Sequence, residues 1–169
     1  QQSQSGLAKS LARLSSGCKI VSPADDAAGL AVSSRLDAQV QRIGAARANV
    51  GNAISFTQTQ DGYLNKISRA LDRLSELTIL ARDGTKTDAD RQLYDAEFQT
   101  LAAYVTEGSG KSFNGVPLFS RTSLDVTTHG DGPVFTMDGI DLGVAPYTAV
   151  TGSDITTIAN AETALTNVL

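Results

Sequence analysis

Apolar residues recur at helical spacing along one long, proline-free stretch, from about residue 25 to about residue 82. The steps between them are threes, fours and their sums, the period of one face of an α-helix. The positions are Leu36, Val40, Ile43, Val50, Ile54, Leu64, Ile67, Leu71, Leu74 and Leu77. An uninterrupted helix of this length would measure roughly 85 Å, far longer than the usual globular helix. Such a helix has to lie along other helices, so we expect the rest of the chain to pack against it.

Four glycines interrupt this pattern, namely Gly29, Gly44, Gly51 and Gly62. A glycine inside an exposed helix costs about 1 kcal/mol relative to alanine. They therefore predict either close helix–helix approach or a local break, and the regular part of the helix is expected to begin after Gly29.

The segment before the long stretch predicts a separate helix over residues 1–16. Leu7, Leu11 and Leu14 are spaced by four and three, and Gly17 is a natural helix stop. Residues 18–24 then form a link. Ser22 or Asp25 is expected to cap the long helix, because side-chain oxygens of these residue types accept from free N–H groups at a helix start.

The dipeptide Asp83-Gly84 predicts a turn that ends the long helix. A third helix is expected over about residues 88–107, capped by Thr87 or Asp88. Its apolar face contains Leu93, Tyr94, Phe98, Leu101, Ala102 and Val105. A short turn followed by a matching apolar stripe predicts an antiparallel helical hairpin.

The pattern changes from about residue 113, where turns become frequent. Asn114-Gly115 between apolar residues is a strong signal for a β-hairpin. Short strands are expected within 116–143, followed by a loop over 144–153. The strand positions are Leu124 with Val126, Val134 with Phe135 and Met137, and Ile140 with Leu142. A last helix, over about 155–169, is expected to be capped by Ser153 or Asp154.

These elements predict a mainly α fold: an elongated antiparallel helical bundle or rod with a long central helix, plus a small β-hairpin region. Residues 1–115 and 154–169 would form the helical rod, and 116–153 the hairpin and loop region of the same domain. With 169 residues, the chain is long enough for one domain.

Composition narrows the possible functions. Aromatic residues make up only 5% and tryptophan is absent, so the core is expected to be built from aliphatic side chains. The formal net charge is −4 and no basic cluster indicates nucleic-acid binding. No apolar run is long enough for a membrane span, and the start shows no signal-peptide pattern. Because the sequence does not begin with Met, we expect a trimmed chain or a fragment.

The chemical motifs are weak. Residues 108–112 read GSGKS, but a phosphate-binding loop also needs a glycine at position 105, which is Val105, and a preceding strand. His129 is the only histidine and Cys18 the only cysteine, which excludes a histidine metal cluster and an intrachain disulfide. His129 is expected to be solvated at a hairpin tip. We therefore predict no enzyme activity and no cofactor.

Charged and polar residues on the outer faces of the two central helices are more informative. They are Arg69, Arg73, Glu76 and Arg82 on the long helix, and Asp95, Glu97 and Gln99 on the third. One interpretation is plain solvation, with helix ion pairs that contribute a few tenths of a kcal/mol each. The other is a lateral contact between subunits.

Several stretches resemble bacterial flagellin. LARLSSGCKIVSPADDAAGLAVSSRL (11–36) resembles the family's helix end, basic-Ile pair and Asp-Asp-Ala-Ala-Gly opening of the long helix. Residues 52–85 resemble the middle and exit of that helix, and SFNGVPLF (112–119) the start of its β-hairpin region. The final residues, 155–169, resemble the onset of the returning C-terminal helix. Cys18 departs from the pattern, where a larger residue is more usual.

The resemblance implies a structural subunit of the flagellar filament that assembles by helix packing for bacterial motility. Members are secreted unfolded by the flagellar export machinery, with a chaperone, and their terminal helices build the inner tube of the filament. Because most of both terminal helices is missing here, this chain is expected to be an assembly-incompetent core. The resemblance also implies a minimal flagellin, without an outer variable domain, whose place is extracellular, in the flagellum.

In some members of the family, a vertebrate toll-like receptor binds the exposed face of the central helix pair. The matching positions here are Arg73, Leu77 and Glu97, with Asp83 and Gly84 at the adjoining turn, and the same face is expected to contact neighbouring subunits. Three alternatives stay open: a hook–filament junction protein of the same machinery, a soluble nucleotide-binding helical protein that uses GSGKS, and a generic coiled-coil adaptor.

Overall fold

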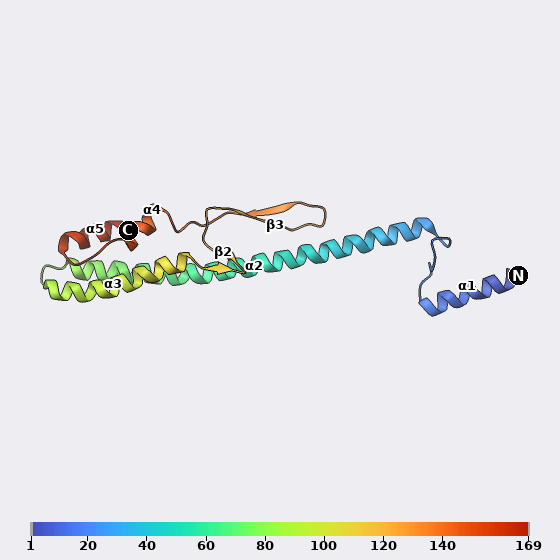
Figure 1. The fold of residues 1–169 in the computed structure, drawn as a ribbon, viewed down its shortest axis with the longest axis horizontal. Coiled ribbons are helices and arrows are strands. Elements are labelled where there is room, and N and C mark those ends of the chain that lie inside the picture. Colours follow the sequence, from blue (N-terminus) through green and yellow to red (C-terminus); the bar gives the residue numbers. More distant parts are fainter. Residues whose placement is uncertain (1, 169) are drawn as a thin grey trace. The chain divides into compact units, whose positions relative to one another are not determined.

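A computed structural model describes residues 2–168 of the chain (Figure 1). The elements are α1 (Gln2–Ser16), α2 (Ala27–Arg82), α3 (Asp88–Ser109), β1 (Ser112–Phe113), β2 (Val116–Pro117), β3 (Leu124–Thr127), β4 (Val134–Met137), α4 (Ala145–Thr151) and α5 (Ile158–Val168). The expected fold class, mainly helical with a small β-hairpin region, is confirmed.

The chain divides into two compact units. The first contains residues up to 49 together with 127–133, and the second contains 50–126 and 134 onward. The first unit is therefore α1, the link and the first part of α2, joined by the turn between β3 and β4. The second holds the rest of α2 with α3, α4 and α5, and it contains almost all of the buried core.

The predicted long helix is confirmed as α2, which has 56 residues. It begins at Ala27, before Gly29, so the expectation of a later start is wrong. The reason is local: Asp26 Oδ1 accepts a hydrogen bond from Gly29 N at 2.8 Å, which satisfies a free donor of the first turn. Asp26 therefore has the capping role that was predicted for Ser22 or Asp25. Asp25 instead accepts from Val21 N at 3.2 Å and pairs with Lys9.

The glycines inside α2 neither break the helix nor allow another helix to approach. A Cβ atom at Gly44, Gly51 or Gly62 would meet nothing within 4 Å. Gly29 differs, because a Cβ there would lie 2.5 Å from Asp26 Oδ2 and 3.0 Å from Ile20 Cδ1. The capping contact of Asp26 thus requires a residue without a side chain at position 29.

The predicted antiparallel hairpin is formed by the second half of α2 and by α3 (Figure 1). Thr87 begins α3 with a capping box, in which its hydroxyl accepts from Asp90 N while Asp90 accepts from Thr87 N. Arg91 is 4% exposed, and it donates from Nε to Ala81 O at 2.8 Å and from Nη2 to Asp83 O at 3.0 Å. Arg91 therefore satisfies the Ala81 carbonyl at the end of α2, which the helix itself leaves free. It also adds a second donor to the Asp83 carbonyl, which accepts from Lys86 N as well.

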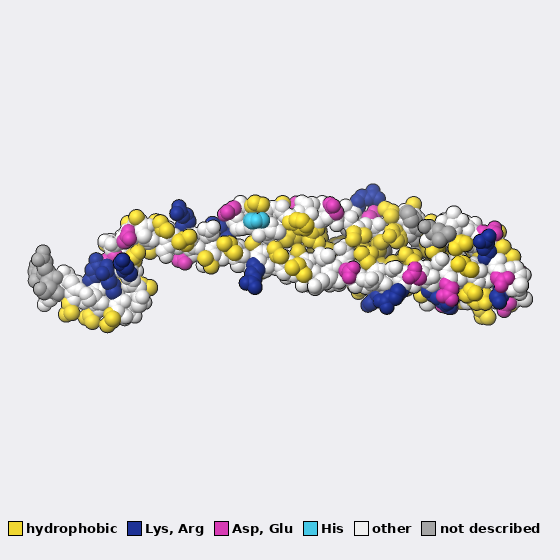
Figure 2. All heavy atoms as spheres, turned by 180° about the vertical axis from the view of Figure 1, so that it is seen from behind, with side chains coloured by type: hydrophobic (Ala, Val, Ile, Leu, Met, Phe, Trp, Pro, Cys, Tyr) yellow, Lys and Arg dark blue, Asp and Glu magenta, His cyan; other side chains and the backbone are white. Residues whose placement is uncertain are grey.

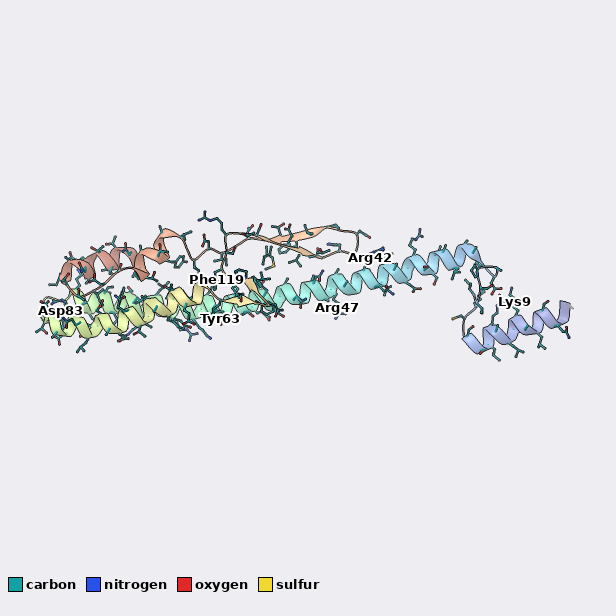
Figure 3. The ribbon with its side chains drawn as sticks, in the orientation of Figure 1. Lys9, Arg42, Arg47, Tyr63, Asp83 and Phe119 are labelled. Carbon is teal, nitrogen blue, oxygen red and sulfur yellow. The ribbon has the colours of Figure 1, made fainter. Side chains whose placement is uncertain are left out.

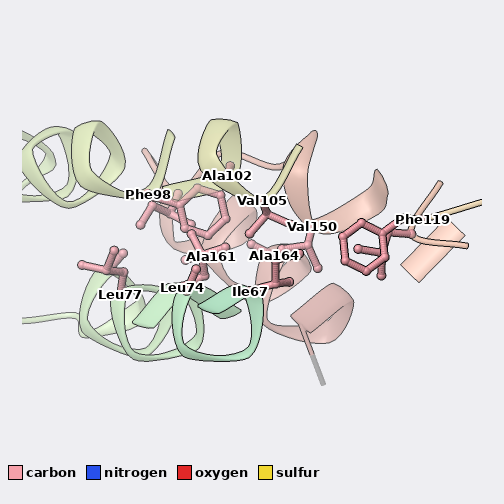
Figure 4. Close-up of a cluster of buried hydrophobic side chains, with 14 of the residues drawn as sticks. Ile67, Leu74, Leu77, Phe98, Ala102, Val105, Phe119, Val150, Ala161 and Ala164 are labelled. Carbon is pink, nitrogen blue, oxygen red and sulfur yellow. The ribbon is translucent and has the colours of Figure 1, made fainter. Parts of the chain in front are cut away.

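Four helices, α2, α3, α4 and α5, contribute to the main core (Figure 4). Leu74 and Leu77 of α2 and Phe98 of α3 are completely buried. Ala161 and Ala164 of α5 are buried beside them, and their small side chains let α5 lie close to the pair. The core is mostly aliphatic, as expected, but Phe56, Phe98 and Phe119 are also buried in it, and Phe98 is its largest fully buried side chain.

The β region differs in part from the prediction. Asn114 and Gly115 form the turn of the β1–β2 hairpin with positive φ angles of 49° and 80°, and Phe113 pairs with Val116. Residues 124–127 and 134–137 form the second two-stranded sheet, as expected. Ile140 and Leu142 do not form a strand, and 144–153 is not a loop, because α4 occupies Ala145–Thr151. Tyr147 and Val150 of α4 pack against the core, which explains why this segment is helical.

The last helix, α5, begins at Ile158, three residues later than expected. Its start is capped by Thr157, whose hydroxyl accepts from Asn160 N at 3.2 Å. Asp154, one of the two predicted caps, instead holds the preceding turn by accepting from Thr156 N at 3.2 Å.

The apolar stripe of α2 is buried along only part of its length. Ile67, Leu74 and Leu77 lie in the core, whereas Val40 is 69% and Ile43 is 55% exposed. The apolar stripe of α2 is therefore covered by α3 and α5 in the second unit, and it is largely exposed to solvent in the first unit.

Candidate interaction surface

The most organised polar feature of the second unit is an ion cluster around Arg73, which links α2 to α3. Arg73 Nε donates to Glu97 Oε1 at 2.7 Å, and Arg73 Nη2 donates to Glu97 Oε2 at 3.0 Å. Arg73 Nη1 lies 2.6 Å from Glu76 Oε2. Two parallel bonds fix the guanidinium and the Glu97 carboxylate in one plane, so both side chains present a defined surface.

This geometry shifts the pKa values of Arg73 and Glu97. The hydrogen bonds from Arg73 hold the pKa of Glu97 below its ordinary value of 4.5. The carboxylates of Glu97 and Glu76 in turn raise the pKa of Arg73. With two carboxylates around one guanidinium, this part of the surface is negative at neutral pH. A partner that binds here is best matched by positive or hydrogen-bond-donating groups.

The residues predicted to contact a partner do not all lie on this surface. Arg73 and Glu97 are brought together, and Asp83 and Gly84 are exposed at the turn after α2. Figure 3 labels Asp83 at this turn. Leu77 is 0% exposed and lies in the core, so its proposed direct contact is corrected: its side chain supports the surface from below. The family resemblance named Leu77 as a contact position beside Arg73, but its side chain is buried in the core cluster.

The turn itself is a rigid feature. Asp83 Oδ1 accepts from Thr85 N at 2.9 Å, and this bond holds the pKa of Asp83 below its ordinary value. Arg91 binds the Asp83 carbonyl from inside, as described above. The exposed Asp83 and Gly84 therefore stand on a fixed backbone, which suits a contact surface.

Two other polar residues on α3 have structural roles that the sequence did not indicate. Asp95 Oδ1 accepts from Ile155 N at 2.9 Å, and Gln99 Nε2 donates to Ser153 O at 3.0 Å. Together they hold the segment before α5 against α3. Arg82 lies 3.4 Å from Glu162 of α5. All of these residues occupy polar positions of an amphipathic pattern, so the sequence does not distinguish them from solvated residues. Only the contacts between the helices in the structure do.

The weak chemical motifs form no reaction centre. Gly108 is buried inside α3, and Lys111 pairs with Glu107 at 2.5 Å, so GSGKS is a helix end followed by β1 and not a phosphate loop. His129 is exposed and lines, with Arg47, an open cleft of about 300 Å³ beside α2. Cys18 is exposed. Among the described residues, His, Cys, Asp and Glu nowhere gather in a group that could hold a metal ion.

Within residues 2–168, no helix is both long enough and apolar enough to cross a bilayer. Figure 2 shows instead that acidic and basic side chains are mixed over the outside of the α2–α3 hairpin. The fold defines a helical-bundle protein whose α2–α3 pair carries an ordered, charged outer surface.

Comparison with known proteins specifies the family. The family model described as the bacterial flagellin N-terminal helical region matches residues 1–123. The chain therefore belongs to the bacterial flagellin family. The recognition based on the Asp-Asp-Ala-Ala-Gly and Phe-Asn-Gly stretches is confirmed.

Similar proteins include the phase 1 flagellin of Salmonella naestved and the flagellin of Salmonella dublin. Each is 36% identical over 140 residues, which cover 81% of this chain. The chain spans 28% of the length of these relatives. A crystal structure of Bacillus cereus flagellin is also similar, with a TM-score of 0.61, 26% identity and 73% of each chain covered.

Proposed function

We propose that this chain is the core of a structural subunit of the bacterial flagellar filament. The observation that carries the proposal is the flagellin match over residues 1–123. The helical core supports it, because α2, α3 and α5 hold a polar outer surface rigid enough for repeated subunit contacts. Assembly buries such surfaces between identical copies, as in other homo-oligomers.

The same reasoning ranks the alternatives. A hook–filament junction protein shares the long-helix pattern, but no feature of this chain favours it over a flagellin. A nucleotide-binding protein would need the GSGKS segment to follow a strand, and here it ends a helix. A coiled-coil adaptor would not need the two small sheets. We infer that the protein has no enzymatic activity and needs no cofactor.

Partners and location follow from the family as part of the proposal. The chain would be exported by the flagellar export machinery with its chaperone and would act extracellularly, in the flagellum. We retain the division into a helical rod, 1–115 with 154–169, and a hairpin region, 116–153. Arg73, Glu97, Asp83 and Gly84 would form a contact surface for neighbouring subunits and for a vertebrate toll-like receptor.

Electron microscopy tests the filament proposal. The complete protein that carries this sequence would be seeded with filament fragments, alongside the isolated 169-residue chain. Long tubes from the complete protein and none from the 169-residue chain are expected. If the complete protein remains monomeric but binds the ends of hooks or filaments, the junction-protein alternative is correct.

Receptor recognition has its own test. Arg73→Ala with Glu97→Ala removes both sides of the ion cluster and leaves the core intact, since both side chains are partly solvent-accessible. We expect weaker signalling through the receptor than from the unmodified protein. A matched double variant at exposed polar positions nearer the start of α2, Asp61→Ala with Asn65→Ala, is expected to signal normally. Equal signalling by both double variants would remove the receptor from the proposal.

A further inference from the structure

The turn of the β1–β2 hairpin (Figure 1) consists of an asparagine followed by a glycine, and no other asparagine of the chain precedes a glycine. Phe113 pairs with Val116, so Asn114 and Gly115 are the two residues of the turn. Their φ angles are 49° and 80°, and Asn114 is the only non-glycine residue with a positive φ among those that the structure describes. A tight hairpin turn of this kind needs positive φ at both central positions, so its backbone requires this pair of residue types.

The groups of this pair that can react with each other are unprotected. Both residues are exposed, and a Cβ atom at Gly115 would meet nothing within 4 Å. Within residues 2–168, neither the side-chain amide of Asn114 nor the N–H of Gly115 takes part in a hydrogen bond. Glycine also has no side chain that would shield its nitrogen. The amide carbon of Asn114 and the nitrogen of Gly115 are therefore accessible to each other and to water.

The other asparagines of the chain are held in helices. They are Asn49, Asn52 and Asn65 in α2, and Asn160 and Asn167 in α5. Inside a helix the backbone does not rotate freely, and its N–H groups are bonded to the carbonyls of the preceding turn. All of these asparagines except Asn52 also donate a hydrogen bond from the side-chain amide. The contrast between Asn114 and these residues comes from the fold as well as from the following glycine.

We propose that Asn114 is a site of spontaneous deamidation, which proceeds through a cyclic imide formed with Gly115. Hydroxide removes the proton from the Gly115 nitrogen, and this nitrogen attacks Asn114 Cγ. A C–N bond forms in the ring, and the side-chain nitrogen leaves as ammonia after it takes a proton from water. A water molecule then opens the imide at either of its carbonyls and leaves aspartate or isoaspartate. The net reaction consumes one water and releases one ammonia.

Ring closure requires the backbone of the turn to rotate at Asn114, and the hairpin permits this. The strands β1 and β2 have two residues each, and a two-stranded hairpin by itself is only marginally stable in water. The base of the hairpin is held separately. Leu118 N donates to Lys111 O at 2.9 Å, and Leu118 O accepts from Gln60 Nε2 of α2 at 2.7 Å. The turn can therefore open while the hairpin stays attached to α2.

The two products differ in their effect on the hairpin. Aspartate adds a negative charge and leaves the length of the backbone unchanged. Isoaspartate also inserts a methylene group into the main chain, and a two-residue turn with a longer backbone does not keep Phe113 opposite Val116. The ring of Phe113 meets the ring of Phe56 edge to face, with centroids 6.0 Å apart. We expect isoaspartate to weaken both the strand pairing and this aromatic contact.

Peptide mapping by mass spectrometry tests the site in the folded, unassembled protein. The protein is incubated in buffer made with heavy-oxygen water, so that each hydrolysis labels its product. Asn114 is expected to lose its amide several-fold faster than any other asparagine, at a rate proportional to the hydroxide concentration. Asn52 is the matched control, because it is exposed and its side chain has no hydrogen bond within residues 2–168, but Ala53 follows it inside α2. If Asn114 keeps its amide as long as Asn52 does, the inference is wrong.

Two variants separate the chemistry from the folding of the hairpin. Asn114→Gly keeps a residue that adopts positive φ and removes the reacting amide, so its release of ammonia should fall to that of the helical asparagines. Asn114→Asp adds the charge without the methylene group. Hydrogen exchange at Leu118 N should be faster in the isoaspartate form than in the unmodified protein, and close to unmodified in Asn114→Asp. Equal ammonia release from Asn114→Gly and the unmodified protein would overturn the site, and unchanged exchange in the isoaspartate form would overturn its effect on the hairpin. The filament proposal is independent of both results, because the reaction needs only the turn.

Discussion

Arg73 and Glu97 lie 24 positions apart in the chain and meet through two parallel hydrogen bonds of 2.7 Å and 3.0 Å. This pair joins α2 to α3 on the outside of the bundle. It also orders two charged side chains that would otherwise sample many rotamers. Both side chains are substantially solvent-exposed, so the pair contributes little to stability and is better explained as the ordering of a contact surface.

Removing Arg73 is expected to change the titration of Glu97. In Arg73→Ala, the pKa of Glu97 should rise towards its ordinary value of 4.5, because the hydrogen bonds that lower it are lost. In the unmodified protein, the small stabilisation from this pair is complete above the ordinary pKa. This stabilisation is lost as pH falls through the lowered pKa of Glu97. In the variant, the free energy of unfolding should lack this dependence on pH. NMR titration of the Glu97 carboxyl group measures the shift. Arg69→Ala, whose side chain binds only the Asn65 carbonyl, should leave it unchanged.

Two substitutions on the apolar stripe of α2 should differ greatly in their effect on stability. Leu74→Ala leaves a cavity among α2, α3 and α5 and is expected to lower the free energy of unfolding by about 2–5 kcal/mol. Val40→Ala changes a side chain that is 69% exposed and should cost less than about 0.5 kcal/mol. Urea denaturation followed by circular dichroism compares them. A similar loss in both variants would mean that the first part of α2 is buried in solution.

Alanine substitutions at two glycines should have opposite effects on stability. A Cβ atom at Gly139 would lie 2.2 Å from Ser120 O and 2.8 Å from both Arg121 C and Thr122 O, so Gly139→Ala should displace the loop after β4. Gly44 has open space around it inside α2, and Gly44→Ala should stabilise the protein by up to about 1 kcal/mol. Thermal unfolding of both variants is the measurement. A neutral Gly139→Ala would show that Ser120 and Gly139 are not packed backbone to backbone.

Arg91 is expected to be the most important charged residue for stability. Arg91→Ala leaves the Ala81 carbonyl without its side-chain donor and the Asp83 carbonyl with the Lys86 N–H alone, and it should lower the free energy of unfolding by about 2–3 kcal/mol. Arg82→Ala removes an exposed pair with Glu162 and should change it by less than about 0.5 kcal/mol. Arg91→Lys separates charge from geometry, since a lysine keeps the charge but reaches at most one of the two carbonyls. If the Arg91→Lys variant is as stable as the unmodified protein, the two hydrogen bonds that the planar guanidinium donates together are not required.

Local signals explain which parts of the fold were predictable. The ends of α1, α2 and α3 were close to their predicted positions because Gly17, Asp83-Gly84 and Thr87 act on the backbone next to them. The helix α4 was missed because it is only seven residues long and has no side-chain cap, so packing of Tyr147 and Val150 decides its conformation. The contact surface was predictable only in part. Arg73, Leu77 and Glu97 were named from the family pattern, but Leu77 also belongs to the apolar stripe of the long helix, and the structure buries it.

The sequence by itself determined the long helix and the hairpin that follows it, because helical periodicity and turn residues act over a few neighbouring positions. Its resemblance to flagellin over residues 11–36, 52–85 and 112–119 indicated the family. Tertiary structure alone decided which half of the apolar stripe is covered, that Arg91 is inside while Arg82 is outside, and that Arg73 uses both oxygens of Glu97. The physical reason is that burial and ion pairing depend on residues far apart in the chain, and the same amphipathic pattern is compatible with either outcome until another helix packs against it.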